Sequence, residues 1–248
     1  MSKTDPNCPF PETADIHTST DEYAGRFAGA WGEWMLGVQE RLTLELLADL
    51  PQGATVLDVG GGHGQLAYPL VREGYAVTVL GSDESCKHRI ESLVEEGKAR
   101  FLVGSVVALP FADDSFDAVV CFRLLTHCEM WPTLVKELCR VARKVVVVDY
   151  PTSQSANAIA PALFGAKKKF EKNTRTWKLF RHAEVAQAFE ACGWRRGGIK
   201  KQFALPMVLH RMLRSKGVSA AAEGVCRVLG LTRLAGSPVI AKWVPGGR

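Results

Sequence analysis

A glycine-rich turn between a strand and a helix is the part of this sequence best suited to bind a ligand. The string Val56-Leu57-Asp58-Val59-Gly60-Gly61-Gly62-His63-Gly64-Gln65 joins an apolar run to a helical pattern. Glycines put no side chain between backbone and ligand and tolerate a positive φ. In open α/β sheets such a turn lies at the carboxyl end of a strand, where ligands bind. The predicted ligand contacts of the turn are Gly60, Gly61, Gly62 and Gly64.

Two kinds of ligand fit this turn. The run Gly62-His63-Gly64-Gln65-Leu66-Ala67 satisfies the short GxGxxG/A dinucleotide fingerprint, which by itself is a weak signal. Asp58 stands two places before the first glycine. A carboxylate there suits a cationic ammonium group or a network of donors better than a pyrophosphate. The sequence therefore disfavours a nicotinamide-dependent oxidoreductase, which stays as an alternative.

Two motifs together resemble one enzyme family. The complete Asp-x-Gly-x-Gly-x-Gly string is similar to motif I of the class I S-adenosylmethionine-dependent methyltransferases. The segment LPFADDSFDAVV, which begins at Leu109, resembles the LPF…D…SFD-V segment that leads into the fourth strand of that family. The small-molecule branch that methylates ubiquinone and menaquinone precursors is the most similar. The resemblance covers Tyr23 to Asp149 and implies S-adenosylmethionine as cofactor.

The resemblance also implies which residues contact the cofactor. Asp58 and the glycine turn would surround the amino-acid end. The acid that the family places on the ribose hydroxyls falls here on Gly81. Asp83, or Glu84 in its place, is therefore expected to supply that carboxylate, and a helix-capping role is the alternative for Asp83. The other expected contacts are Ser105 and Val106 at the adenine ring, and Arg123, Tyr23 and Arg26 elsewhere around the cofactor.

His127 is the candidate general base. It follows the predicted fourth strand, where this family meets cofactor and substrate, and its ordinary pKa lies near neutrality. A structural histidine is the alternative. Because a sulfonium is already an activated methyl donor, catalysis needs mainly alignment of the acceptor with the methyl group. No Cys/His cluster has metal-ligand spacing, so no metal is expected.

Alternating strands and helices must position these residues. Apolar runs predict strands at 55–59, 76–80, 100–103, 117–122 and 145–149, and helical patterns predict helices at 65–72, 84–96 and 132–142. Such alternation predicts right-handed βαβ units in a parallel sheet. Two further strands, 198–205 and 238–244, flank an insertion at 206–236 that is expected to form one or two short helices. With the resemblance, the expected fold is a Rossmann-like, seven-stranded, mostly parallel sheet with helices on both faces and an antiparallel last strand.

The predicted domain organisation is simple. Residues 1–20 are polar and contain prolines, which indicates a flexible tail. Residues 21–248 are expected to form a single domain. Within it, 21–50 would be a helical cover, 51–150 the cofactor-binding core and 151–248 the substrate side.

Composition excludes several classes of protein. With 248 residues, of which 47% are hydrophobic, the chain can bury a sizeable core. No apolar run approaches the roughly 20 residues of a transmembrane helix, and the N-terminus lacks a secretory signal. The seven cysteines include no CxxC pair, which is typical of reduced thiols in a cytoplasmic protein.

A basic stretch runs from Phe164 to Lys216, with 14 Lys/Arg and 3 Asp/Glu. It is open to three interpretations: a solvated surface, an RNA-binding face, or a site for a membrane surface or anionic amphiphile. The RNA interpretation uses Phe170, Trp177 and Phe180 as stacking candidates, but nucleic acid is not the expected partner. The segment Leu205–Arg214 mixes apolar and basic residues as an interfacial helix does.

The sequence thus predicts a methyltransferase that acts on a small or amphiphilic molecule, such as a prenylated quinol or lipid precursor. Peripheral contact with a membrane surface through the basic C-terminal half is part of this hypothesis. The alternatives are a protein that binds S-adenosylmethionine or its demethylated product as a sensor or partner subunit, and an RNA methyltransferase.

Overall fold

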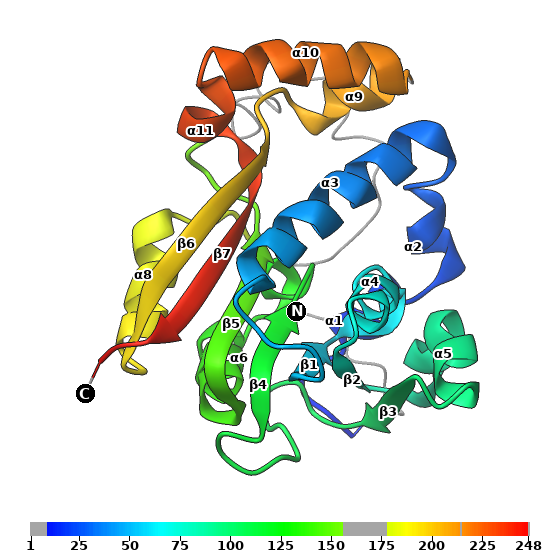
Figure 1. The fold of residues 1–248 in the computed structure, drawn as a ribbon, viewed down its shortest axis with the longest axis vertical. Coiled ribbons are helices and arrows are strands. Elements are labelled where there is room, and N and C mark those ends of the chain that lie inside the picture. The colour runs from blue at the N-terminus through cyan, green and yellow to red at the C-terminus, as the bar shows by residue number, and fades with distance from the viewer. Residues whose placement is uncertain (1–8, 156–177, 214, 248) are drawn as a thin grey trace.

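The protein, described by a computed structural model over residues 9–155, 178–213 and 215–247, is a seven-stranded sheet covered by helices (Figure 1). The strand order is β3-β2-β1-β4-β5-β7-β6. The first five strands pair in parallel, and β7 is antiparallel to both of its neighbours. The predicted fold class is confirmed. The strands are β1 Thr55–Val59, β2 Ala76–Gly81, β3 Ala99–Val103, β4 Phe116–Cys121, β5 Ala142–Tyr150, β6 Trp194–Phe203 and β7 Ser237–Pro245.

Helices bury both faces of this sheet. Val56 packs in the cluster that includes α3, α4 and α5, whereas Leu57 packs in the cluster of α6 and α8, because neighbouring side chains of a strand point to opposite faces. By the same alternation Asp58 points toward the α3 side, beside the glycine turn. The helices around the sheet are α3 Gly29–Leu47, α4 Ala67–Arg72, α5 Glu91–Glu95, α6 Trp131–Val141 and α8 His182–Glu190, and the 3₁₀ turns are η1 Gly61–His63, η2 Glu84–Ile90 and η3 Leu125–His127.

The insertion between β6 and β7 forms a separate helical layer. It contains α9 Met207–Leu213, α10 Lys216–Val228 and α11 Leu231–Ala235. The insertion therefore has three helices, whereas the sequence predicts one or two. Figure 1 shows α10 as the outermost element at the top of the molecule, beyond α3. No helix among the described residues is long and apolar enough to cross a membrane.

The N-terminal segment is better ordered than the sequence predicts. Helices α1 Ala14–Thr18 and α2 Asp21–Gly25 precede α3, and Glu12, Asp15 and Ser19 are all buried. The prediction of a flexible tail is therefore wrong for residues 12–19. Polarity is a poor guide here, since these polar side chains find hydrogen-bond partners at the edge of the cleft described below.

Candidate functional site

The glycine turn curls over the carboxylate of Asp58. Gly60 and Gly64 adopt positive φ values of 72° and 77° on either side of η1. A Cβ at Gly61 would lie 2.1 Å from the Asp58 carboxyl carbon, which is far inside van der Waals contact. The chain can therefore pass this closely over Asp58 only with glycine at position 61.

Asp58 is a buried carboxylate that lacks a partner. It is 2% exposed, and no hydrogen bond or ion pair joins its carboxylate to another residue in the described part of the chain. Burial raises its pKa to about 7. An unpaired buried carboxylate is costly, so its presence at the turn indicates a ligand that supplies a positive charge or hydrogen-bond donors.

Arg123 supplies the opposite charge. It follows β4 with a φ of 59°, a left-handed conformation that is strained for a non-glycine residue. Burial lowers the pKa of its guanidinium group. The group stacks over Phe27 at 4.2 Å from the ring centre, and its Nη1 has no hydrogen-bond partner among the described residues. Arg123 thus retains free donor capacity inside the protein.

A polar network fixes Arg123 in place. Its backbone N–H donates to Asp149 Oδ1 at 2.6 Å, and its Nη2 donates to Gln39 Oε1 at 3.2 Å. Gln39 in turn donates to Asp149 Oδ2 at 2.9 Å and accepts from Gln65. Burial raises the pKa of Asp149 to about 6. The sequence analysis did not identify Gln39, Gln65 and Asp149 as site residues. The only signal for them is one polar residue on the apolar stripe of α3.

These groups surround one small cavity of about 20 Å³. That volume holds about one water molecule and is far below the roughly 300–1,000 Å³ of small-molecule pockets. Asp58 and Arg123 both line it, so one cavity presents a carboxyl group and a guanidinium group. Its lining is Thr18, Asp58, Gly60, Gly61, His63, Gln65, Leu66, Phe122 and Arg123.

Helix α1 fills the neighbouring part of the cleft. The Asp15 carboxylate accepts hydrogen bonds from the N–H and the Oγ of Ser82, each at 2.6 Å. A Cβ at Gly60 would lie 3.3 Å from Asp15 Cβ, and one at Gly62 would lie 2.3 Å from Ser19 Oγ. The glycine faces that a ligand would approach are therefore already in contact with α1.

A carboxylate from a different part of the chain lies at the end of β2. A Cβ at Gly81 would lie 2.6 Å from that of Cys86, so no side chain fits there. Asp83 is exposed and caps η2 by accepting from the N–H of Ser85 at 2.9 Å, which matches its capping alternative. Glu84 is exposed as well. The carboxylate that reaches the end of β2 is Asp15, because α1 folds back across it.

The predicted adenine contacts lie outside the cavity. Ser105 Oγ accepts a hydrogen bond from the Val107 N–H at 3.3 Å, and Val106 is fully buried in the α6-side core. His127, the predicted base, is half-buried at the end of η3 and does not line the cavity. The roles predicted for these residues stay predictions.

Aromatic residues close the cavity from the N-terminal side. The ring of Tyr23 meets that of His63 edge-on at 5.6 Å, and the exposed Arg26 lies over the outer face of Tyr23 at 5.1 Å. His63 Nδ1 lies 3.1 Å from the carbonyl of Thr18. Burial, followed by the nearby charges of Arg123 and Arg89, lowers the pKa of His63 to about 3. His63 is therefore neutral at physiological pH.

The basic stretch contributes little to this site. The triple-lysine segment, Phe170 and Trp177 lie outside the described residues. Phe180 is fully buried, so it cannot stack on a base as the RNA interpretation requires. Lys178 pairs with Glu184 and lies over Trp131. No cluster of three or more potential metal ligands occurs in the described ranges.

Comparison with known proteins agrees with this geometry. Residues 57–147 match the family model of a methyltransferase domain. The magnesium protoporphyrin IX methyltransferase of Synechocystis PCC 6803, solved with bound SAH, has the same fold, with a TM-score of 0.63 at 13% identity over 92% of this chain and 96% of that one. The sequence match to this domain covers the central strands of the sheet and the glycine turn, and the structural match shows a common fold. Of the elements that shape the candidate site, α1 and α3 lie outside the matched residues.

Two relatives with known names extend the similarity. The demethylmenaquinone methyltransferase of Beutenbergia cavernae is 29% identical over 225 residues, which cover 79% of this chain and 90% of that protein. The 2-methyl-6-phytyl-1,4-hydroquinone methyltransferase of Synechocystis is 32% identical over 155 residues, covering 59% of this chain and 48% of that protein. The chain spans about half the length of the first curated relatives it matches.

Proposed function

We propose that this protein transfers a methyl group from S-adenosylmethionine to a small or amphiphilic acceptor. The observation that carries the proposal is a pair of groups that line one cavity: the buried Asp58 carboxylate, and Arg123, whose Nη1 has no hydrogen-bond partner among the described residues. The amino-acid end of S-adenosylmethionine carries an ammonium and a carboxylate. The two protein groups are complementary to these charges, because a carboxylate accepts from an ammonium and a guanidinium donates in a fork to a carboxylate.

The chain's own residues would hold and orient the cofactor. Asp58 would accept hydrogen bonds from the ammonium group, and Arg123 would donate to the carboxylate. Gln39 and Asp149 keep Arg123 in its strained backbone position. The bound cofactor supplies an activated methyl group on a sulfonium. The buried site excludes water, which favours the loss of that positive charge as the methyl group leaves.

Cofactor entry requires α1 to move. Asp15 and Ser19 lie against Gly60 and Gly62, so a nucleoside placed over the glycine turn would overlap with them. Displacement of Asp15 would break its two hydrogen bonds with Ser82. We therefore infer that α1 and the cofactor compete for the same part of the cleft.

An amphiphilic acceptor is the finer part of the proposal. Two similar proteins are named for a menaquinone precursor and a phytyl hydroquinone, molecules that join a phenolic head to an apolar tail. His127 lies on the loop that follows β4 and is the candidate base for such a hydroxyl group. Support for this acceptor class comes from those names and from the sequence.

A second candidate function is cofactor binding without turnover. It is favoured by the occupancy of the cleft by α1 and by the absence of a carboxylate at Gly81. Such a protein would act as a sensor or a partner subunit, and binding would be coupled to the position of α1.

Calorimetric titration and methyl transfer separate these possibilities. We expect heat with S-adenosylmethionine and with its demethylated product, and none with NADPH; heat with NADPH alone would refute the assignment. Incubation with methyl-labelled S-adenosylmethionine and cell extract, fractionated into lipid, RNA and protein, should label the lipid pool. Cofactor binding with no label in any pool would instead support the sensor.

A further inference from the structure

The helical insertion carries most of the exposed apolar side chains. Seven of the twelve large hydrophobic residues that are exposed in the described part of the chain lie in α9–α11, and Val228 and Leu234 are 88% and 73% exposed. Large exposed apolar patches on a protein surface mark interaction sites. The seven residues are Met212, Val218, Val225, Val228, Leu229, Leu231 and Leu234.

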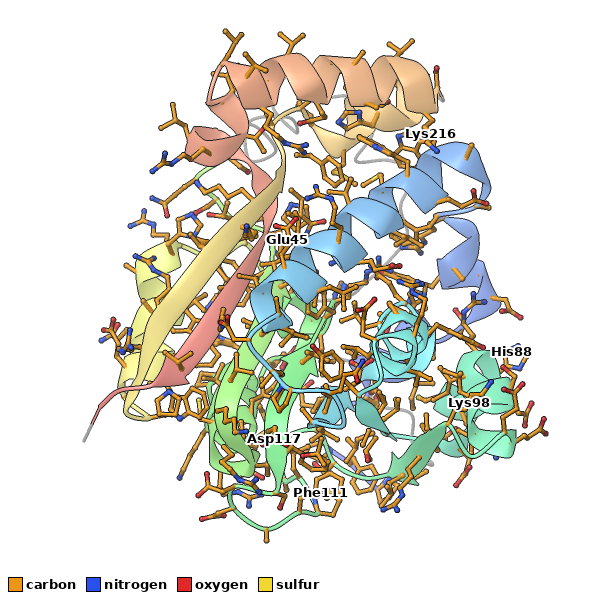
Figure 2. All side chains as sticks on the ribbon, in the orientation of Figure 1. Glu45, His88, Lys98, Phe111, Asp117 and Lys216 are labelled. Carbon is orange, nitrogen blue, oxygen red and sulfur yellow. The ribbon has the colours of Figure 1, made fainter. Side chains whose placement is uncertain are left out.

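Helix α10 turns its apolar face outward. At about 100° per residue, the apolar positions from Val218 to Leu229 fall within an arc of about 120°. The buried positions of the same helix are Ser219, Glu223 and Cys226, on a different arc. An amphipathic helix of a globular protein normally buries its apolar stripe. In Figure 2 the side chains on the outer side of α10 point away from the protein, and Lys216 lies at the end of α10 above α3.

Buried hydrogen bonds fix this orientation. The Glu223 carboxylate accepts from the backbone N–H groups of Ala204 and Leu205, both at 2.9 Å, and lies 3.0 Å from His210 Nε2. Rotation of α10 to bury its valines would break these contacts and leave two buried donors unpaired. The outward apolar face is therefore a stable feature of the fold.

The insertion itself is rich in cations. From Met207 to Ala235 the chain has five Lys/Arg and a single acid, and that acid is the buried Glu223. Lys216 and Arg227 lie on the polar flank of α10 and line a surface cleft next to α3, together with Glu33 of α3. An apolar face with cationic residues on its polar side is the pattern of a helix that lies in a membrane interface. A second copy would bring two cationic regions together.

We propose that the outer face of α10 and α11 docks on an anionic lipid bilayer. The apolar residues would enter the boundary between headgroups and acyl chains, and the surrounding cations would be attracted to anionic lipid. This surface differs from the interfacial segment predicted at Leu205–Arg214, since His210 in that segment is fully buried. The proposal does not depend on methyl transfer, so its test can fail without affecting the proposed function.

Vesicle co-sedimentation of the full chain tests the proposal. Vesicles of phosphatidylcholine mixed equally with phosphatidylglycerol should bind the protein, those of phosphatidylcholine alone should bind it much less, and added salt should weaken the binding. The triple variant Val225→Ser/Val228→Ser/Leu229→Ser should lower the partition coefficient about tenfold or more, because less apolar surface enters the interface.

The matched control is Leu102→Ser/Val103→Ser, which removes exposed apolar side chains from β3, at the other edge of the sheet. It should leave vesicle binding unchanged. Circular dichroism and urea unfolding, compared with the wild type, show whether the triple variant is folded. Equal loss of vesicle binding in both variants would overturn the proposal, and so would no binding of the wild type to the mixed vesicles. A wild type that sediments as a dimer and a triple variant that sediments as a monomer would also overturn it, in favour of a second copy of the chain.

Discussion

The replacement Asp58→Asn tests the buried carboxylate that anchors the proposed site. The folded protein raises the pKa of Asp58 to about 7, against roughly 4 for an unfolded aspartate. The folded state therefore binds a proton more tightly than the unfolded state, and stability falls as pH rises between these two values. Integrated from about pH 5 to about pH 8, the titration of this one group lowers the free energy of unfolding by about 2–3 kcal/mol. Asparagine does not titrate, so the variant should lack this contribution.

The assay is urea unfolding of both proteins at each pH. Other titrating groups are common to the two chains and cancel when the pH-dependent changes are subtracted. Asp83→Asn is the control, because Asp83 is exposed and its pKa is lowered by the hydrogen bonds from Ser85. Identical pH dependence in the wild type and Asp58→Asn would refute the raised pKa, and with it the argument that the Asp58 carboxylate is buried without a partner.

The same variant should lose cofactor affinity. An ammonium–carboxylate hydrogen bond contributes roughly 1.5–3 kcal/mol, so S-adenosylhomocysteine should bind about ten- to hundredfold more weakly to Asp58→Asn. In the wild type, affinity should rise with pH through about 7, as Asp58 becomes ionised. Methylthioadenosine, which lacks the amino-acid end, should bind both proteins equally. An equal loss of affinity for both ligands would mean that the substitution does not act through the amino-acid end of the cofactor.

Three further results are expected. Arg123→Met should weaken binding of S-adenosylhomocysteine about tenfold or more while sparing methylthioadenosine in calorimetry, and equal effects on both ligands would contradict the assigned role. Asp15→Ala removes the buried hydrogen bonds to Ser82 and should release α1. It should therefore tighten the binding of S-adenosylhomocysteine up to about tenfold and speed proteolysis near residue 15. Weaker binding would instead make Asp15 a ligand of the cofactor. His127→Gln should slow methyl transfer to the labelled lipid pool by about a hundredfold without changing the affinity for S-adenosylhomocysteine, and an unchanged rate would make it a structural residue.

The sequence determined the central fold and the turn. The strands, their order of alternation with helices, and the glycine string around Asp58 all follow from local patterns, because apolar periodicity and glycine spacing act over a few residues. The structure confirms the sheet, and the close approach of Gly61 to Asp58 explains why that string needs glycine. The role predicted for Asp83 stays a prediction; in the structure its side chain is exposed and caps η2.

Only the tertiary structure decided which distant residues complete the site. Asp15 reaches Ser82 across 67 residues of chain, and Gln39 reaches Asp149 across 110; no local pattern encodes such pairings. The orientation of α10 is a similar case. Its sequence predicts an amphipathic helix but not which side packs inward, and the side was decided by Glu223, which binds backbone donors of the β6–α9 connection. Local patterns specify elements, whereas burial and long-range hydrogen bonds decide which of their faces meet.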